Sequence, residues 1–207
     1  MPHDMTSDTE PAAQPPGLRE RKRRATAERI AHAARTLFRE RGFDATTVDQ
    51  IALAAGVSRR SFFHHFASKE DVIFAGKNEM EAALTSAIAS QPPDEPLLRV
   101  ARRAVVAAAS HFDRDEAVAL ARLMHDSPAV RVRNHVRYEE LERVMAARLG
   151  ERLGGNPDRL RARLVAMVAI GVLRVAGETW LAKAADDERP EDYARRVFRT
   201  LSGELAK

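Results

Sequence analysis

The chain has no cysteine and few aromatic residues, and these shortages limit the classes of protein to which it can belong. Without cysteine, its 207 residues can form neither disulfides nor zinc sites with cysteine ligands, and thiol chemistry is excluded. Aromatic residues make up only 5% of the chain, and β-branched runs are scarce. Alanine, arginine, leucine and glutamate dominate instead, a composition that favours an all-α protein.

Long hydrophobic runs are also missing. The longest apolar run extends from Leu164 to Leu173 and ends at Arg174. It is about half the length of a membrane-spanning helix. The N-terminus is polar and proline-rich, so we predict no signal peptide. These features predict a cytoplasmic protein that has no membrane partner.

Basic residues are concentrated towards the N-terminus, although the formal net charge of the whole chain is only +4. Residues 17–70 contain 12 lysines and arginines against 6 acidic residues, whereas residues 71–207 contain 22 and 21. We expect the first segment to meet a polyanion and the second segment not to. A basic surface that is merely solvated accounts for the charge alone equally well.

The N-terminal part of the chain carries the signals of a small helical domain. Residues 1–17 contain four prolines and no hydrophobic periodicity, so we predict a disordered tail. The segment LRERKRRATAERI follows, and a helical apolar stripe then runs to Gly42. Thr47 and Gln50 fit a capping box, and Ser58 is suited to cap the next helix. Two helices joined by a tight Ala-Gly-Val turn are typical of a helix-turn-helix domain, which we assign to residues 18–70.

Residues 71–207 are predicted to form a second helical domain. The hydrophobic periodicity and the breaks at proline and glycine predict helices over residues 69–90, 97–112, 117–125, 128–153, 158–185 and 190–205. Together with the three helices of the N-terminal domain, this gives about nine helices and no strand. The single helix over residues 69–90 is expected to connect the two domains.

The segment VSRRSFFHHF in the middle of the first domain combines charge with three phenylalanines, and a helix separates these residues by face. Phe62 and Phe66 are four residues apart and point towards the first two helices. Arg59, Arg60 and Ser61 face outward at the start of the helix. Arginine there can pair with guanine edges or phosphates in a major groove. Solvated surface residues are the alternative interpretation.

Residues 25–72 resemble the DNA-binding domain of the tetracycline-repressor (TetR) family. The resemblance depends on the motifs LF-x-x-x-G-F, TTVDQIA, AGVS and F-x-SKE, which occur in that order. It implies a homodimeric regulator, most often a repressor, that binds an inverted-repeat operator in double-stranded DNA. It also implies that eight residues approach the DNA, namely Thr47, Ser58, Arg59, Arg60, Ser61, Phe63, His64 and Lys69.

Two residues depart from the family pattern. Phe63 stands where the family usually has a tyrosine whose hydroxyl reaches a phosphate, and Arg60 stands where a small residue is frequent. Base preference therefore does not follow from any relative. The basic residues from Arg19 to Arg24 resemble arms that follow the minor groove in some members, and a solubilising tail is the alternative.

The histidines do not form a recognisable metal or catalytic site. His64 and His65 are consecutive and project about 100° apart, so a regular helix cannot direct both at one metal. His111, His125 and His135 belong to different segments, and no nucleophile–base motif accompanies them. We predict no metal, no cofactor and no enzymatic activity.

The second half resembles a subgroup of the TetR family with an acyl-CoA-like ligand-binding domain, to which the regulator of mycofactocin clusters belongs. The resemblance depends on SPAVRVR and RLRARLVA. It implies an amphipathic ligand such as acyl-CoA, and we place six residues near its pocket: Phe112, Met124, His125, Tyr138, Met145 and Met167. Ordinary core packing is the alternative for each of them.

The last two predicted helices indicate how two copies of the chain associate. The helix over residues 158–185 has an apolar surface too wide to pack on one side only, and the final helix adds Tyr193, Val197 and Phe198. Such helices can pair across a two-fold axis in an interface on the order of 2,000 Å². Burial in a single core is the alternative.

These features predict a ligand-responsive transcriptional regulator that is released from its operator by the ligand. The rival from another class is a helical acyl-ligand- or lipid-binding protein without sequence-specific DNA binding, whose basic arm meets membranes. The arm LRERKRRATAERI has almost no apolar face, which argues against a membrane-binding helix.

Overall fold

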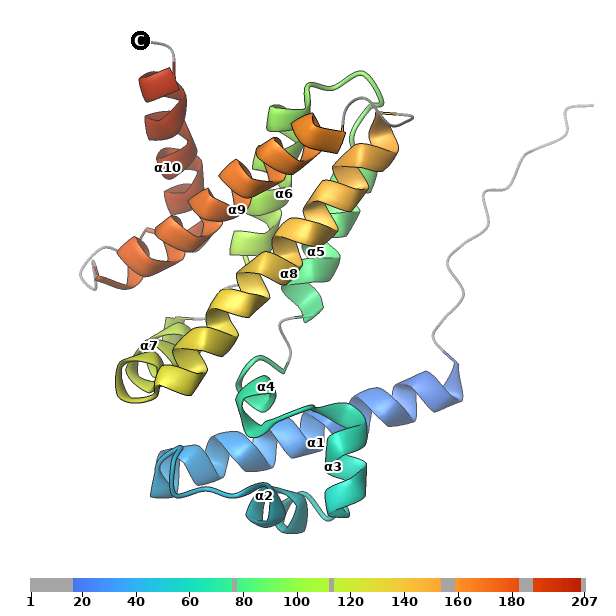
Figure 1. Ribbon diagram of the computed structural model, residues 1–207, viewed down its shortest axis with the longest axis vertical. Helices are drawn as coiled ribbons and strands as arrows, with labels where there is room; N and C mark the ends of the chain where they lie inside the picture. The colour runs from blue at the N-terminus through green and yellow to red at the C-terminus, as the bar shows by residue number, and fades with distance from the viewer. Residues whose placement is uncertain (1–16, 76–77, 112–113, 154–158, 183–187, 206–207) are drawn as a thin grey trace, which may run out of the picture.

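The computed structural model describes residues 17–75, 78–111, 114–153, 159–182 and 188–205 (Figure 1). These residues form helices and no strand, which confirms the all-α prediction. The helices are α1 (Leu18–Arg41), α2 (Val48–Ala54), α3 (Arg59–His65), α4 (Lys69–Ile73), α5 (Asn78–Ala89), α6 (Leu97–Ala109), α7 (Arg114–Asp126), α8 (Pro128–Arg152), α9 (Arg159–Ala182) and α10 (Pro190–Leu205).

The prediction of one helix over residues 69–90 is wrong, and this is why the described residues contain ten helices rather than about nine. The short helix α4 ends at Ile73, and Phe74 and Ala75 form a turn. The side chain of Phe74 is buried in the N-terminal core with only 4% of its surface exposed. Burial of this aromatic ring favours the turn over continuation of the helix.

The N-terminal domain packs α1 to α4 around a small hydrophobic core. Phe62 of α3 is fully buried there, and Phe66 and Val57 pack against the same cluster. Gly56, in the turn between α2 and α3, has φ 64°, a backbone conformation that residues with a Cβ rarely adopt. The glycine therefore permits the tight turn that directs Phe62 inward.

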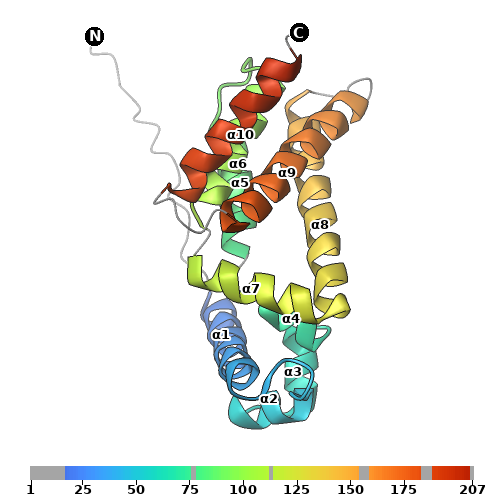
Figure 2. The same cartoon turned by 90° about the vertical axis from the view of Figure 1, so that its left-hand side faces the viewer.

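The C-terminal domain is a bundle in which α5, α6, α8, α9 and α10 enclose a larger core. Fully buried side chains from all five helices meet in it, including Leu84, Val100, Leu141, Leu173 and Phe198. Figure 2 shows α7 lying between this bundle and the N-terminal domain. Within the described part of the chain, no helix is both long enough and apolar enough to cross a membrane.

The two domains meet where α4 packs against α8 and where α7 lies across the N-terminal domain (Figure 2). Leu120 of α7 and Val130 of α8 are buried in the N-terminal core rather than in the bundle. Arg133 of α8 forms an ion pair with Asp71 of α4 and a second one with Glu140, at 3.3 Å. Burial alone would lower the pKa of Arg133, but its hydrogen bond to Asp71 and the charges of Asp71 and Glu140 raise the pKa above its usual value. The guanidinium is therefore held in its charged form at the boundary between the domains.

Candidate nucleic-acid interface

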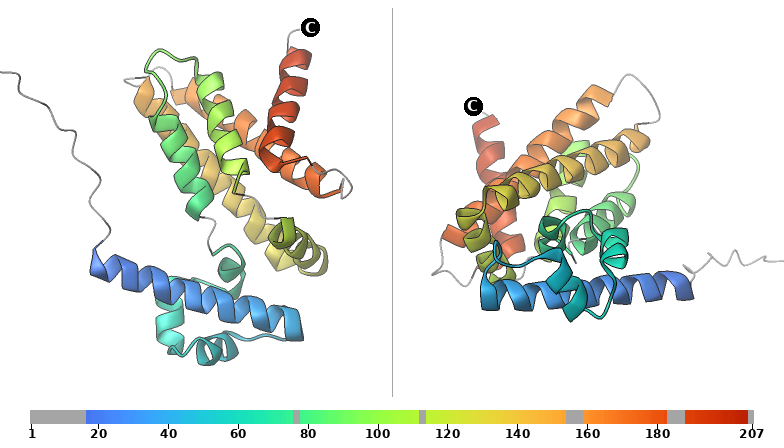
Figure 3. Two further views of the ribbon diagram at one scale, coloured as in Figure 1. Left: turned by 180° about the vertical axis from the view of Figure 1, so that it is seen from behind. Right: turned by 60° about the horizontal axis from the view of Figure 1, so that its bottom comes forward.

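Helix α3 lies at the end of the molecule opposite α9 and α10 (Figures 2 and 3), and its exposed residues are mostly polar or basic. The helix begins at Arg59 and is capped by Ser58, whose Oγ accepts a hydrogen bond from the backbone N–H of Ser61 at 3.0 Å. Phe62 anchors the opposite face in the core. The structure brings six of the eight predicted DNA-contacting residues together on or next to α3: Ser58, Arg59, Arg60, Phe63 and His64 are exposed, and Ser61 is half-buried.

The two arginines on this face are held differently. Arg59 Nη1 donates a hydrogen bond to Asp49 Oδ2 of α2 at 2.7 Å. The Arg59 guanidinium also lies over the ring of Phe63, 5.5 Å from its centroid. Arg60 takes part in none of the hydrogen bonds and ion pairs found among the described residues. One arginine is thus oriented by the protein, while the other is available to any acceptor.

Thr47 and Ser58 combine a structural role with a free donor. Thr47 caps α2 in the predicted capping box, with its Oγ1 accepting from Gln50 N at 3.2 Å and Gln50 Oε1 accepting from Thr47 N at 2.9 Å. In both caps the hydroxyl oxygen is the acceptor, which leaves its O–H available to donate. Each of the two hydroxyls can therefore cap its helix and at the same time donate a hydrogen bond to a phosphate oxygen.

Lys69 is another predicted DNA contact that has protein partners. Its Nζ donates to the carbonyl oxygens of Phe43 at 2.9 Å and Thr46 at 3.2 Å, and it lies 4.3 Å from the centroid of the Phe43 ring. An ammonium group has three donors, so one remains for a phosphate. No sequence pattern predicts the two carbonyl contacts, which connect α4 to the turn before α2.

The basic segment at the start of the first domain is helical, because α1 begins at Leu18. Residues 18–25 are exposed. Burial lowers the pKa of His65, and the nearby charges of His64 and Arg23 lower it further.

The predicted ligand-binding residues are not brought together by the structure. Phe112 lies outside the described residues. Met124 of α7 packs against the N-terminal core, His125 is exposed, and Met145 of α8 is fully buried in the bundle. Tyr138 packs against the bundle core, where burial and the charge of Glu178 raise its pKa to about 12. Met167 of α9 is 49% exposed on the outside of the bundle.

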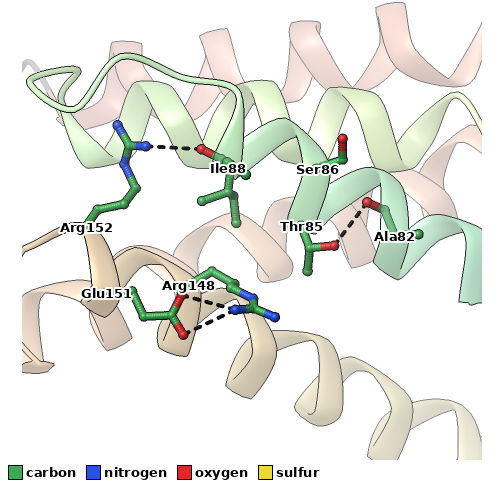
Figure 4. Close-up of a pocket in the computed structure, with 8 residues that line it drawn as sticks. Ala82, Thr85, Ser86, Ile88, Arg148, Glu151 and Arg152 are labelled. Atoms are coloured by element: carbon green, nitrogen blue, oxygen red, sulfur yellow. Dashed lines mark hydrogen bonds and ion pairs between the residues drawn. The ribbon is translucent and has the colours of Figure 1, made fainter. Parts of the chain in front are cut away.

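A groove between α5 and α8 was not predicted from the sequence. It has a volume of about 560 Å³ and is lined by Ala82, Thr85, Ser86, Ile88, Ala89, Arg148, Glu151 and Arg152 (Figure 4). Arg148 and Glu151 form an ion pair at 3.1 Å, and Arg152 donates to the carbonyl oxygen of Ile88 at 3.2 Å. The alanines at positions 82 and 89, seven residues apart on one face of α5, are the only signal that the sequence offers for it.

Metal ligation has no candidate in the described ranges, where no three histidine, aspartate or glutamate side chains are close enough to share an ion. The rings of His64 and His65 meet edge to face, with their centroids 5.4 Å apart. The arrangement around α3 is instead that of a helix-turn-helix protein which contacts DNA.

Comparison with known families agrees with this class. Residues 30–75 match the family described as bacterial regulatory proteins, tetR family, and residues 95–206 match the MftR C-terminal domain. The second match alone covers more than half of the chain. The protein belongs to the TetR family of transcriptional regulators.

Individual relatives share most of their length with this chain. It is 34% identical over 194 residues to the transcriptional regulator TcmR of Streptomyces glaucescens, covering 88% of this chain and 84% of that protein. It is 30% identical over 164 residues to a mycofactocin biosynthesis regulator, MftR, of Mycobacterium tuberculosis, covering 78% and 82%. The fold is shared with the fatty acid degradation regulator FadR of Bacillus halodurans, with a TM-score of 0.53, 20% identity and coverage of 93% and 98%.

Proposed function

We propose that this protein is a homodimeric repressor that binds an inverted-repeat operator through α3 of each subunit and is released by a small amphipathic ligand. The observation that carries the proposal is the outward face of α3. Two arginines, a serine and a histidine are displayed there on a short helix that Phe62 anchors in the core. A capped helix with such a face suits insertion into a major groove.

In this proposal the eight residues divide into two groups. Arg59 and Arg60 are candidates for base contacts, because a guanidinium can donate two hydrogen bonds to a guanine edge. The others fix the position of α3 through the DNA backbone, which carries no sequence information directly. This second group consists of Thr47, Ser58, Ser61, His64 and Lys69, which can form hydrogen bonds to the backbone, and Phe63, which can make only apolar contact with it.

A dimer is supported by an exposed apolar stripe on α9. Leu160, Leu164, Met167 and Val175 are 68%, 49%, 49% and 43% exposed, and their spacing places them along one face of the helix. The opposite face of α9 is buried in the bundle core. A large apolar stripe left in water favours association, and a second copy of α9 across a two-fold axis covers it symmetrically. Met167 then belongs to the interface between subunits rather than to a ligand pocket.

The ligand response is supported by the way the two domains are connected. A ligand that alters the position of α8 changes the ion pair between Arg133 and Asp71, and therefore the position of α4 next to α3. The ligand shifts the population away from DNA only by its difference in affinity for the two arrangements. We propose an amphipathic ligand such as acyl-CoA, consistent with the resemblance of residues 95–206 to the MftR C-terminal domain.

We also propose that the protein acts in the cytoplasm by binding rather than by catalysis. The relatives described above are transcriptional regulators, not enzymes. A regulator that binds double-stranded DNA must share a compartment with the chromosome.

Selection of bound fragments from genomic DNA, followed by footprinting, tests the proposal. We expect the full-length protein to enrich an inverted repeat whose half-sites lie about one or more helical turns apart. Equal affinity for unrelated fragments, or full affinity for a single half-site, would contradict it. Acyl thioesters added to the operator complex then test the ligand, with the fluorescence of the single tryptophan, the buried Trp180, reporting binding. The acyl-ligand proposal fails if no thioester binds the free protein and none releases the DNA.

A further inference from the structure

The neighbouring residues Arg59 and Arg60 have the same chemistry but different surroundings. Arg59 is held by Asp49 of α2 through a hydrogen bond of 2.7 Å. Arg60 has no such contact with the described residues. The sequence alone does not distinguish the two arginines as readers of DNA bases, because both lie at the exposed start of α3. The difference arises from α2, which brings a carboxylate within reach of only one of them.

The Arg59 guanidinium is oriented on two sides. Asp49 occupies Nη1, and the central guanidinium carbon lies over the ring of Phe63, 5.5 Å from its centroid. Phe63 itself packs edge-on against Phe62, with the ring centroids 5.4 Å apart and an interplanar angle of 84°. Because Phe62 is fully buried, this stack is anchored in the core of the domain.

Two groups of donors on Arg59 remain free for DNA. A guanidinium carries five N–H donors in a rigid planar fork, and only Nη1 is occupied by Asp49. The Nε and Nη2 groups are still available, and two adjacent donors are what a guanine requires for a bidentate contact with O6 and N7. Orientation before binding matters, because it reduces the side-chain entropy that is lost when the contact forms.

We propose that Arg59 is the specificity-determining residue that reads a guanine in each half-site, and that Asp49 is the residue that positions it. Arg60, which has no such support, contacts phosphates. The inference rests on the proposed function, since it assumes that α3 binds an operator. Beyond that function, the inference distinguishes Arg59 from Arg60 as the residue that reads the DNA sequence. It also assigns a role to Asp49, an acidic residue in a basic surface.

The ion pair is weak in the free protein and becomes important at the DNA. Both side chains are more than 60% exposed, so water and salt screen their attraction. In a major groove the same pair is partly shielded from water, and the attraction strengthens. The Asp49 carboxylate also repels phosphates, which disfavours all DNA. Only a guanine at the correct position offsets this repulsion, so Asp49 raises the ratio of operator affinity to non-specific affinity.

The test compares four single variants and one double variant of the full-length protein. Asp49→Ala removes the carboxylate, Arg59→Ala and Arg60→Ala remove each guanidinium, and Asp49→Ala with Arg59→Ala completes a double-mutant cycle. Asp115→Ala is the matched control, because Asp115 is an exposed carboxylate near the start of α7, in the other domain. Affinity is measured for the selected operator, for single-base variants of it and for unrelated DNA. Thermal unfolding checks that every variant folds.

We expect Arg59→Ala to weaken operator binding by about 5- to 150-fold and to remove the preference for guanine at one position in each half-site. Asp49→Ala should weaken the preference for guanine at that same position, and should thereby lower the ratio of operator to non-specific affinity by about three- to fivefold. The double variant should lose no more discrimination than Arg59→Ala alone, because Asp49 acts through Arg59. Arg60→Ala should weaken all DNA binding alike, and Asp115→Ala should change neither quantity.

Two results would overturn the inference. One is an unchanged affinity ratio in Asp49→Ala; the other is discrimination losses that multiply in the double variant. Neither affects the proposed function, which requires only that the wild-type protein selects an operator. If the wild-type protein selects no sequence at all, the proposed function fails first.

Discussion

The proposed DNA-binding surface and the C-terminal half of this protein differ in how their candidate functional residues are distributed along the chain. The predicted DNA-contacting residues lie within or next to a single helix, from Ser58 to His64, with Thr47 and Lys69 close by in sequence. The described pocket candidates are spread over α7, α8 and α9. The structure places Met124 against one core and Tyr138 and Met145 in or against the other, and it leaves His125 and Met167 exposed. A surface on one short helix is determined by local periodicity, whereas a pocket depends on how distant helices pack.

The contrast extends to the way side chains are held. On the proposed DNA-binding face, Arg59 of α3 is oriented by two residues that are close in sequence. Asp49 lies on the preceding helix α2, and Phe63 lies on α3 itself. At the domain boundary, Arg133 reaches Asp71 from a position 62 residues away in the sequence. A regulator needs both arrangements, because recognition requires a rigid surface and response requires a contact between parts that can move.

The largest effect is expected from a charge on the α9 stripe. Leu164→Glu places a carboxylate in the middle of the proposed subunit interface, and burying it unpaired is costly. We expect the dimer to dissociate and operator affinity to fall by about 100-fold or more, because each subunit then binds its half-site alone. Light scattering after size exclusion measures the first effect, and a titration of operator DNA measures the second.

Leu98→Glu is the control for this variant. Leu98 of α6 is 40% exposed and does not belong to the α9 stripe. We expect Leu98→Glu to leave the dimer intact. If Leu164→Glu also stays dimeric, the stripe is not the interface, and the position of Met167 must be explained in another way.

Much of the fold could be predicted because its signals are local. Thr47 and Ser58 cap α2 and α3 as predicted, and Ser68 caps α4 in the same way, since each cap depends on a residue three positions away. The break after Ile73 could not be predicted, because Phe74 turns into a core that also contains Leu120, contributed by a distant part of the chain. Periodicity within residues 69–90 carries no information about that partner.

The candidate site follows the same division. The outward face of α3 was predicted from the spacing of Phe62 and Phe66, and the exposures agree with it. The unequal support of Arg59 and Arg60 was not predicted, because it depends on the orientation of α2 relative to α3. The carbonyl contacts of Lys69 and the groove between α5 and α8 depend on tertiary packing in the same way.

A smaller effect is expected at Tyr138, where alkaline pH distinguishes a core residue from a pocket residue. Burial, together with the charge of Glu178, raises the pKa of Tyr138 to about 12 in the folded protein. The unfolded chain ionises near its ordinary value of about 10. A raised folded-state pKa gives stability that is fully present below about pH 10 and is lost as the pH rises through about 12.

Urea unfolding of the wild type and of Tyr138→Phe over this pH range measures the difference. We expect the wild type to lose on the order of 2 kcal/mol more stability than the variant between about pH 10 and about pH 12. Equal losses would show that Tyr138 already ionises normally in the folded state. Such a result would favour a solvated pocket over the core and would weaken the contrast between the two halves.

The smallest effect is expected at Phe63, and it tests whether the DNA face separates base contacts from backbone contacts. The ring of Phe63 supports Arg59 but carries no hydroxyl, so it cannot donate to a phosphate. Phe63→Tyr restores the donor while keeping the ring. A net hydrogen bond contributes about 0.5–1.5 kcal/mol, so we expect affinity for operator and for unrelated DNA to rise by a similar factor of about two to ten.

The conservative partner of this variant is Phe63→Leu, which keeps a bulky apolar side chain and removes the aromatic face under Arg59. We expect it to reduce the preference for guanine without strengthening binding to unrelated DNA, because Arg59 loses one of its two supports. The two variants thus change different quantities at one position. A phosphate contact alters affinity for every sequence, whereas the orientation of an arginine alters the choice among sequences. If Phe63→Tyr shifted base preference instead of overall affinity, backbone and base contacts would be coupled at this residue, and the separation inferred between Arg59 and its neighbours would fail.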